Sequence, residues 1–391
     1  MRLLVLNYEY PPLGGRAGVI TRNISERLAN RNNKITVITT WFDGEPEDIT
    51  DGSLRVIRLK SKRKYIFRSD PKEMLSWMSA SKKFLREHLK TEKYDLCLAN
   101  FALPGGEVAY SMKLIYGLPY VILSHGHDIP WLFPEQMMWY HALTYHWIHK
   151  ICLQSERNYI RSKDMKDNID SFLGKKFSSK NMIINNGWDS SIFKPDYSKR
   201  SRQFIILFPG RLVKQKEPLI FLQAIKILKD QIPEFKVHIL GDGYLRKKME
   251  IFVSESNLNN TVIFKSWISQ EEMLHEYQTA SLTVLPSLNG DMSIATLEAI
   301  TCGQYLITTK VPNNNDLIIP NINGNFIEKN NPGDIAKKIF DYYSEKFSNG
   351  YLLPVEELGK YHKLFEWDKI IDMYEEDFDK IILEAKLKRD L

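Results

Sequence analysis

The sequence predicts an α/β protein made of two parallel-sheet halves in tandem. Short runs that are apolar throughout alternate with helix-like segments, which indicates buried strands covered by helices on both faces of a sheet. The alternation stops at a polar, charged stretch, residues 196–203, and then restarts, so we expect a linker there. A chain of 391 residues with 43% apolar and 26% charged residues can bury two cores, and this composition excludes a disordered or fibrous protein.

The first half begins with an apolar run that stops at a loop rich in proline and glycine, residues 10–18. A helix is expected next, because Ile20, Ile24 and Leu28 recur every four residues along one side. The apolar runs that we predict as strands of this half are 3–6, 35–38 and 120–123.

The second half repeats the pattern more regularly. Ser269 and Glu272 form a capping box that opens one of its helices. The predicted strands are 204–208, 237–240, 262–264, 282–285 and 305–308, and the predicted helices are 218–229, 245–254, 293–301 and the one that follows Ser269.

The last segment, residues 367–386, is predicted to be a charged amphipathic helix docked on a core. Its apolar stripe consists of Ile370, Ile371, Tyr374, Phe378 and Ile381. The only D-x-D motif, Asp377-Phe378-Asp379, lies on this helix, and we expect it to be a solvated face rather than a metal site.

Charge and cysteine content narrow the class of protein. The 54 Lys and Arg exceed the 48 Asp and Glu, a mild excess of +6 that weakly favours an anionic partner and gives little support to nucleic-acid binding. Cys97, Cys152 and Cys302 are far apart, so neither a disulfide framework nor a zinc site is indicated. No apolar run reaches the ~18–20 residues of a spanning helix, and we expect a cytoplasmic protein.

The residues 55–90 form a strongly basic segment. They include 12 Lys or Arg against 3 Asp or Glu, interleaved with aromatic residues such as Trp77 and Phe84. Cations with exposed aromatics suit an anionic membrane surface, which would allow a peripheral location on the cytoplasmic face of a membrane. A solvated basic face above core aromatics fits the pattern equally well.

Four loops at predicted strand ends carry residues suited to a ligand. Ligands of open parallel sheets bind at the carboxyl ends of the strands, where glycines let backbone N–H groups approach them. Arg211 and Lys216 are two cations that suit a diphosphate, one as a planar fork and one as a point charge. Alternatively, their loop is a solvated basic turn. The other three loops are Gly14–Gly18, Ser124–Asp128 and Gly290–Ala299.

Glu298 and the loop with two histidines can each be interpreted in more than one way. Glu298 lies in an otherwise apolar helix, so it either contacts a polar ligand or partner or points to solvent. His125, His127 and Asp128 share one loop, but a single carboxylate beside two histidines is a thin set of metal ligands, and we predict no metal site.

Taken together, these motifs resemble those of the retaining glycosyltransferases of family 4, which have the GT-B fold. The resemblance extends over nearly the whole chain and rests on five segments in the family's order. They are Tyr8-Glu9-Tyr10-Pro11-Pro12 with Gly14-Gly15, Ser124-His125-Gly126-His127-Asp128, Ile184-Asn185-Asn186-Gly187-Trp188-Asp189 with Phe193-Lys194-Pro195, Gly210-Arg211-Leu212 with Lys216, and Leu297-Glu298-Ala299 with Cys302-Gly303.

The resemblance implies two Rossmann-like domains whose parallel sheets face each other across a cleft. Residues 1–195 with the crossover helix 368–391 would form the acceptor-side domain, and residues 196–367 would bind the nucleotide-sugar. The implied catalytic residues are Arg211, Lys216 and His125. The implied donor-binding residues are Gly15, Trp267, Asp291, Ser293, Thr296, Leu297 and Glu298.

The implied activity is transfer of a sugar, with its anomeric configuration retained, from a UDP- or GDP-sugar to a glycan or lipid-linked acceptor in cell-surface polysaccharide or glycolipid assembly. Arg211 and Lys216 would stabilise the leaving diphosphate, so no metal or cofactor is expected. Glu298 would hold the donor ribose, and His125 would contact the donor sugar.

The sequence departs from the family's pattern at three places. The first acid of the usual E-x7-E pair is absent, since Gly290 stands there and Asp291 follows one residue later. Glu217 replaces a glycine after Lys216, and residues 313–316 replace a glycine-containing turn.

The lost acid permits a non-catalytic partner subunit of the same fold, although the intact Arg211, Lys216 and Glu298 argue against it. Another GT-B activity, such as a phosphorylase or an epimerase, is a separate alternative.

Overall fold

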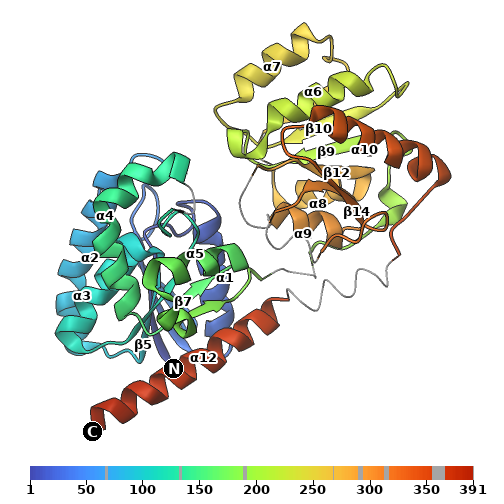
Figure 1. Cartoon of the computed structure of the whole chain (residues 1–391). Helices are drawn as coiled ribbons and strands as arrows, with labels where there is room; N and C mark the ends of the chain where they lie inside the picture. The colour runs from blue at the N-terminus through green and yellow to red at the C-terminus, as the bar shows by residue number, and fades with distance from the viewer. Residues whose placement is uncertain are drawn as a thin grey trace. The chain divides into compact units, whose positions relative to one another are not determined.

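The computed structural model describes residues 1–66, 69–131, 134–187, 192–266, 268–288, 294–311, 317–354 and 366–390. They form two compact units, Met1–Gly187 with Trp367–Leu391, and Trp188–Glu366 (Figure 1). The predicted boundary after residue 195 therefore falls inside the second unit. Phe193 is buried there with its ring 6.1 Å from that of Tyr277, and the Gln278 side chain donates to the Lys194 carbonyl at 3.0 Å.

The first unit contains a sheet of eight strands in the order β3-β4-β2-β1-β5-β6-β7-β8. Its strands pair in parallel except β3, which forms an antiparallel hairpin with β4 at the edge. The strands are β1 (Arg2–Leu6), β2 (Lys34–Thr40), β3 (Asp48–Asp51), β4 (Leu54–Leu59), β5 (Leu96–Asn100), β6 (Tyr120–Leu123), β7 (Asn158–Ile160) and β8 (Asn181–Ile183).

Helices cover both faces of this sheet, as the continuous apolar strands predict. Along β1, Leu4 and Leu6 face one core, whereas Leu3 and Val5 face the other, because side chains alternate along a strand. The helices on the first face are α2 (Pro71–Thr91), α3 (Glu107–Tyr116), α4 (Pro134–Gln154) and α5 (Lys163–Leu173), and those on the second are α1 (Arg16–Asn30) and α12 (Trp367–Asp390).

The second unit contains a parallel sheet of six strands in the order β11-β10-β9-β12-β13-β14. On β9, Ile206 and Phe208 face one core, and Ile205 and Leu207 face the other. The strands are β9 (Ile205–Pro209), β10 (Lys236–Leu240), β11 (Val262–Lys265), β12 (Leu282–Leu285), β13 (Tyr305–Thr309) and β14 (Gly324–Ile327); the helices are α6 (Pro218–Leu228), α7 (Arg246–Glu255), α8 (Gln270–Thr279), α9 (Ile294–Thr301) and α10 (Pro332–Glu345).

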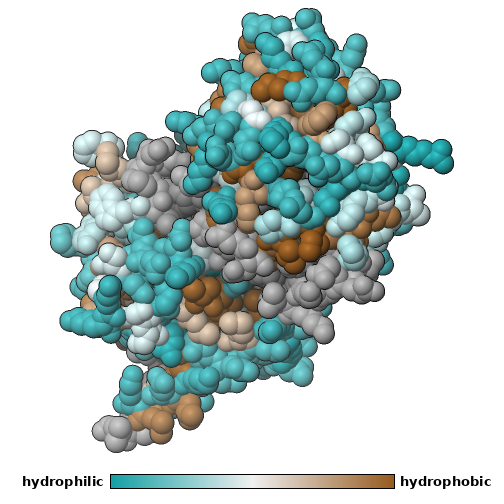
Figure 2. Space-filling view, turned by 45° about the vertical axis from the view of Figure 1, so that its right-hand side comes forward, coloured by the Kyte–Doolittle hydropathy of each residue, from teal (hydrophilic) through white to brown (hydrophobic). Residues whose placement is uncertain are grey.

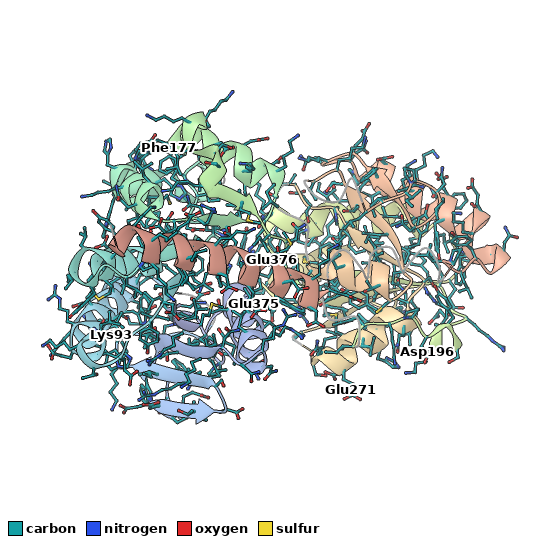
Figure 3. All side chains as sticks on the ribbon, turned by 90° about the horizontal axis from the view of Figure 1, so that it is seen from below. Lys93, Phe177, Asp196, Glu271, Glu375 and Glu376 are labelled. Carbon is teal, nitrogen blue, oxygen red and sulfur yellow. The ribbon has the colours of Figure 1, made fainter. Side chains whose placement is uncertain are left out.

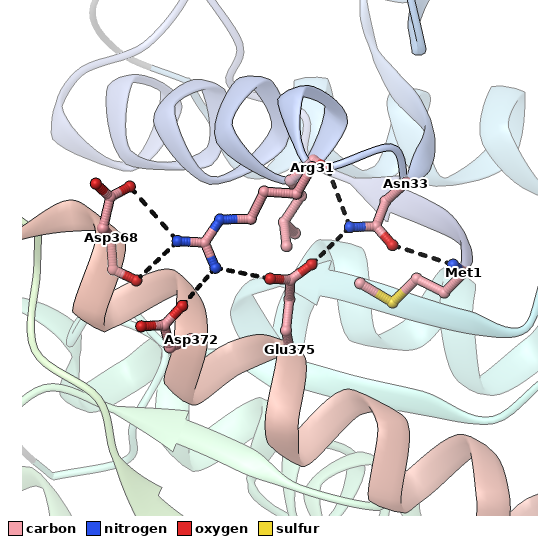
Figure 4. Close-up of polar contacts among 7 residues, drawn as sticks. Met1, Arg31, Asn33, Asp368, Asp372 and Glu375 are labelled. Carbon is pink, nitrogen blue, oxygen red and sulfur yellow. Dashed lines mark hydrogen bonds and ion pairs between the residues drawn. The ribbon is translucent and has the colours of Figure 1, made fainter.

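The C-terminal helix α12 packs across the first unit, although its sequence follows the second (Figures 1 and 3). Arg31, just after α1, ties it down with bonds to Asp372 at 2.5 Å and Glu375 at 2.8 Å. Glu375 also accepts from the Asn33 side chain at 2.7 Å (Figure 4). Distant parts of the chain are thus joined by both charge and apolar packing.

The predicted solvated face at Asp377-Phe378-Asp379 is wrong for Asp377, whereas Phe378 is buried as its place in the apolar stripe predicts. Phe378 is fully buried, and Asp377 is only 6% exposed. The Asp377 carboxylate accepts from the Tyr159 hydroxyl at 2.7 Å and lies 3.3 Å from the Arg157 guanidinium. This acid therefore joins the helix to β7.

The predicted linker at 196–203 is also wrong, because its middle part packs on the second unit. Residues Tyr197–Lys199 form a short helix. The Arg200 guanidinium then donates to the carbonyls of Ala280, Ser281 and Gly303. Burial lowers the pKa of Arg200, and these carbonyls compensate for its lost hydration.

The basic segment 55–90 forms β4, a connection and α2, of which the structure describes all but residues 67–68. Trp77 is fully buried and Phe84 packs against the same core, so these aromatics are structural. Tyr65 and Ile66 are exposed, by 51% and 37%. The pattern is therefore mainly a basic face above core aromatics.

Candidate active site

The loop after β9 carries Arg211 and is shaped by backbone packing. A Cβ on Gly241 would lie 2.3 Å from the Gly210 carbonyl oxygen, and one on Gly243 would lie 2.4 Å from that of Leu212. Gly210 itself has φ +140°, which disfavours other residues. Glycines thus allow two backbone segments to touch and leave the Arg211 side chain exposed at the carboxyl end of the strand.

Lys216 lies in a short helix, Lys214–Lys216, beside a second strand end. Its ammonium group donates to the Ser287 hydroxyl at 3.2 Å, and the Leu288 N–H donates to the Gln215 carbonyl at 3.0 Å. Ser287 follows β12, and the chain then leads to α9. The structure therefore joins the cationic loop to the segment that precedes the Glu298 helix.

Glu217 explains why a glycine is usual at its position. It has φ +51°, in the left-handed region that glycine adopts without strain. The residue is 9% exposed, and burial raises the pKa of its carboxyl group. Glu217 keeps the backbone turn between Lys216 and α6 despite the bulkier side chain.

Glu298 is half-buried on α9 and accepts a hydrogen bond from the Tyr277 hydroxyl at 3.0 Å. Burial, with the Glu298 carboxylate beside it, holds the pKa of Tyr277 well above its usual value, so this hydroxyl remains a donor. The neighbouring Thr296 and Leu297 are buried, and Leu297 packs in the core under α9. The side chain of Leu297 is therefore a support for this helix.

Three predicted donor-binding residues, Trp267, Asp291 and Ser293, lie outside the described residues. The same holds for Gly290 and for the substituted turn at 313–316.

In the first unit, His125 follows β6 and is held on both ring nitrogens. The Arg161 guanidinium donates to Nδ1, and Nε2 lies near the Asn100 amide oxygen, both at 2.9 Å. Because arginine only donates, Nδ1 must accept, and this hydrogen-bond network assigns the proton to Nε2. The ring also packs on Phe101 with 4.5 Å between centroids. His125 is thus a neutral imidazole of fixed orientation.

Asp128 holds the His125 loop to the neighbouring strand end. One carboxylate oxygen accepts from the His125 N–H and the other from the Ala102 N–H, both at 2.9 Å. Asn100 is fully buried and also accepts from the Thr21 hydroxyl at 2.7 Å. This network connects the ends of β5 and β6 with α1.

Gly15 begins α1 and is exposed, with open space where a Cβ would stand. The Glu9 carboxylate accepts a hydrogen bond from its N–H, and burial raises the pKa of Glu9. Gly14, with φ +87°, fits against the Glu9 side chain, since a Cβ there would lie 2.5 Å from that of Glu9. A carboxylate thus already uses this helix N-terminus.

Sequence reasoning missed four residues that position these groups: Asn100, Arg161, Tyr277 and Ser287. A signal existed for Asn100, which directly follows the apolar run Leu96-Cys97-Leu98-Ala99 at a strand end. The other three meet their partners only through the fold.

Two features are absent from the residues that the structure describes. They contain no group of three or more His, Cys, Asp or Glu side chains arranged to hold a metal ion. Nor do they include a helix that is both long and apolar enough to cross a membrane.

Comparison with protein families agrees with this architecture. The sequence model of the Glycosyltransferase Family 4 domain matches residues 14–192, and that of Glycosyl transferases group 1 matches residues 189–352. The two matches follow each other along the chain and together span both units. The chain therefore belongs to the group 1 glycosyltransferases of family 4.

Two curated relatives align with most of this chain. An uncharacterized glycosyltransferase of Methanocaldococcus jannaschii is 26% identical over 95% of this chain and 96% of its own length. The UDP-Gal:alpha-D-GlcNAc-diphosphoundecaprenol alpha-1,3-galactosyltransferase of Escherichia coli is 27% identical over 83% of this chain and 84% of its own.

Among solved structures, sucrose-phosphate synthase from Thermosynechococcus elongatus has a TM-score of 0.83 at 17% identity, over 98% of this chain and 100% of that one. The Anabaena protein HepE in complex with UDP and glucose has a TM-score of 0.75 at 17% identity, over 97% of this chain and 100% of that one. The fold is thus GT-B.

Proposed function

We propose that this chain transfers a sugar from a nucleotide-diphosphate sugar to a glycan or lipid-linked acceptor, with retention of the anomeric configuration. The observation that carries the proposal is the junction at the carboxyl edge of the second sheet. There Lys216 contacts Ser287, and Arg211 is exposed on a loop fixed by glycines. Such an arrangement suits a diphosphate.

In the proposed mechanism, Arg211 and Lys216 stabilise the negative charge that develops on the leaving diphosphate. Fixed cations are already oriented before the reaction, so little reorganisation is needed as charge builds. Arg211 would supply a planar fork and Lys216 a point charge. These two cations would fill the role of a metal ion, and we propose a metal-independent reaction.

Glu298 would position the donor through the ribose hydroxyls. Its carboxylate accepts from the Tyr277 hydroxyl at 3.0 Å, which keeps the carboxylate in one orientation. His125 would contact the donor sugar while Arg161 and Asn100 keep its ring in place. In this role His125 would act through the fixed orientation of its ring and would not transfer a proton.

Two of the similar proteins favour a uridine donor, and one of them favours a lipid-linked acceptor. The E. coli relative is named for UDP-galactose and a diphosphoundecaprenol acceptor, and HepE is also solved with UDP-glucose. We therefore place a UDP-hexose first among donors, and polysaccharide or glycolipid assembly first among pathways. Residues 55–90 add a basic surface suited to an anionic membrane.

The direct test is release of nucleotide from a panel of UDP- and GDP-sugars, with and without acceptors. The acceptor panel should include a polyprenyl diphosphate-linked N-acetylglucosamine. We expect release that depends on an acceptor, persists in EDTA and yields a product of retained configuration by NMR. Release without an acceptor, phosphate-dependent release or sugar epimerisation would favour the alternative enzymes, and no turnover with any pair would favour a non-catalytic subunit.

A further inference from the structure

Helix α4 presents an apolar face that no part of the described chain covers. Trp139 is 77% exposed and Leu143 is 87% exposed, and they lie four residues apart on the same side. Met138 and Trp147 flank them with 48% and 37% exposure. The opposite side of the helix is buried, because Ile148 and its neighbours pack into the core. The exposure is therefore a property of one face.

The surroundings of this face are basic. Residues 137–154 of α4 contain no acidic residue, and Lys150 lies on the same side as Leu143, with its ammonium 5.4 Å from the Tyr110 ring of α3. Glu107 adds no exposed charge, because it is 8% exposed and accepts from Trp147 at 2.5 Å and Lys82 at 2.5 Å.

The helices next to α4 also carry exposed apolar side chains and a cation. Figure 1 shows α2, α3 and α4 along one side of the first unit. On α3, Leu114 and Ile115 are exposed by 68% and 50%. On α2, Arg86 is exposed, and its carbonyl accepts from the Tyr116 hydroxyl of α3 at 2.6 Å. Exposed apolar side chains therefore continue from α4 onto α3, and a cation of α2 lies next to α3.

We propose that this α4 face is a docking surface for an anionic lipid bilayer. Tryptophan is enriched at membrane–water interfaces, where its ring lies at the level of the headgroups. The cations match an anionic headgroup layer, whereas another copy of this face would repel them. The inference rests on the membrane contact of the proposed function and assigns that contact to α4; vesicle binding is measured apart from sugar transfer, so either can fail without the other.

The test is flotation of the full chain with vesicles of equimolar phosphatidylglycerol and phosphatidylcholine. We expect binding that is weaker to phosphatidylcholine alone and that falls as salt rises, since charges are screened within about 8 Å at physiological ionic strength. The double variant Trp139→Ser, Leu143→Ser should lose about tenfold or more in partition coefficient. Its melting temperature should not change, because both side chains are exposed.

A matched control is the double variant Leu383→Ser, Leu387→Ser. These leucines are 60% and 57% exposed, four residues apart on α12, where Figure 2 shows hydrophobic surface near the end of the chain. We expect this variant to bind vesicles like the wild type. Loss of binding in the control instead would assign the docking surface to α12 and overturn the proposal.

A second measurement locates the contact directly. Because Cys97, Cys152 and Cys302 are buried, a thiol-reactive, environment-sensitive dye can be placed selectively on Leu143→Cys. Its emission should shift to the blue with anionic vesicles, and the same dye on Leu383→Cys should not respond. The proposal fails if wild type ignores the vesicles at low salt, if the Trp139 and Leu143 variant binds equally well, or if that variant only converts a dimer to a monomer.

Discussion

His125 shows how a site residue can be fixed before any ligand arrives. Its two ring nitrogens contact Arg161 and Asn100, which come from the ends of two other strands. Glu298 is held in a comparable way by Tyr277. In both cases the partner is a buried residue, so the functional group has one orientation while one side of it stays accessible.

The first prediction concerns Glu298→Gln. We expect the affinity for the donor nucleotide-sugar to fall about tenfold, because hydrogen bonds to a charged group are worth about 1.5–3 kcal/mol. Stability should change little, since the amide oxygen can still accept from Tyr277. Calorimetric titration and thermal melts measure the two effects, with the exposed Glu328→Gln as control. A lower melting temperature of the variant with unchanged affinity for the nucleotide-sugar would instead make Glu298 a structural residue.

The second prediction concerns Glu276, which is 5% exposed. Burial favours its neutral form, but the His238 ring nitrogen at 2.6 Å and the Lys265 ammonium outweigh this and hold the pKa of Glu276 below its usual value. A depressed folded-state pKa gives stability that is present above the unfolded value of about 4.3 and is lost as pH falls through the folded value.

The check is the free energy of unfolding of wild type and Glu276→Gln between pH 6 and pH 3, values chosen to bracket the carboxyl pKa of about 4.3. The advantage of the wild type should be full above that pKa and shrink towards the acid end. A difference that stays constant with pH would mean that the charge of Glu276 does not contribute.

Among the elements, α12 illustrates what holds the first unit together. Its apolar stripe packs on the strands beside α1, and Arg31 anchors its first turns through Asp372 and Glu375 (Figure 4). Arg31 is 29% exposed, and this multidentate contact should be worth more than an isolated surface pair. The helix is nevertheless separated in the sequence from the strands that it covers by the whole second unit.

The third prediction is that Arg31→Ala loosens α12 selectively. We expect the amides of this helix to exchange about tenfold faster, which corresponds to about 1.4 kcal/mol for local opening. Arg22→Ala serves as the control, because Arg22 pairs only with Glu26 on the exposed side of α1, at 2.6 Å. Equal protection of α12 in both variants would show that apolar packing alone holds it.

The elements differ in how far the sequence could predict them. Buried strands such as 3–6 and 282–285 are local apolar runs, so their positions were predictable. The burial of Asp377 was not, because its partners Tyr159 and Arg157 lie far away in the sequence. The burial of Arg200 was not predictable for the same reason, because the carbonyls that it contacts, those of Ser281 and Gly303, lie 81 and 103 residues further along the chain.

For the molecule as a whole, the order of the motifs in the sequence indicates the family. The contacts that hold the candidate site residues in place depend on the fold. Arg211 and Lys216 were predictable as candidates because they are cations after a strand, and Glu298 because it is an acid in an otherwise apolar helix. Their supports, Ser287 and Tyr277, were not, since hydrogen bonds between separate strands leave no local pattern. We propose that the nucleotide-diphosphate binds at the carboxyl edge of the sheet in the second unit.

The most direct test of that assignment is calorimetric titration of UDP and GDP into the wild type and three variants. Arg211→Ala and Lys216→Ala should each weaken binding of the preferred nucleotide by about tenfold or more, because each removes a charge-assisted contact to the diphosphate. Lys214→Ala, in the same short helix, should bind like the wild type. Equal affinity in all four proteins, or no binding of either nucleotide, would contradict a diphosphate site at Arg211 and Lys216.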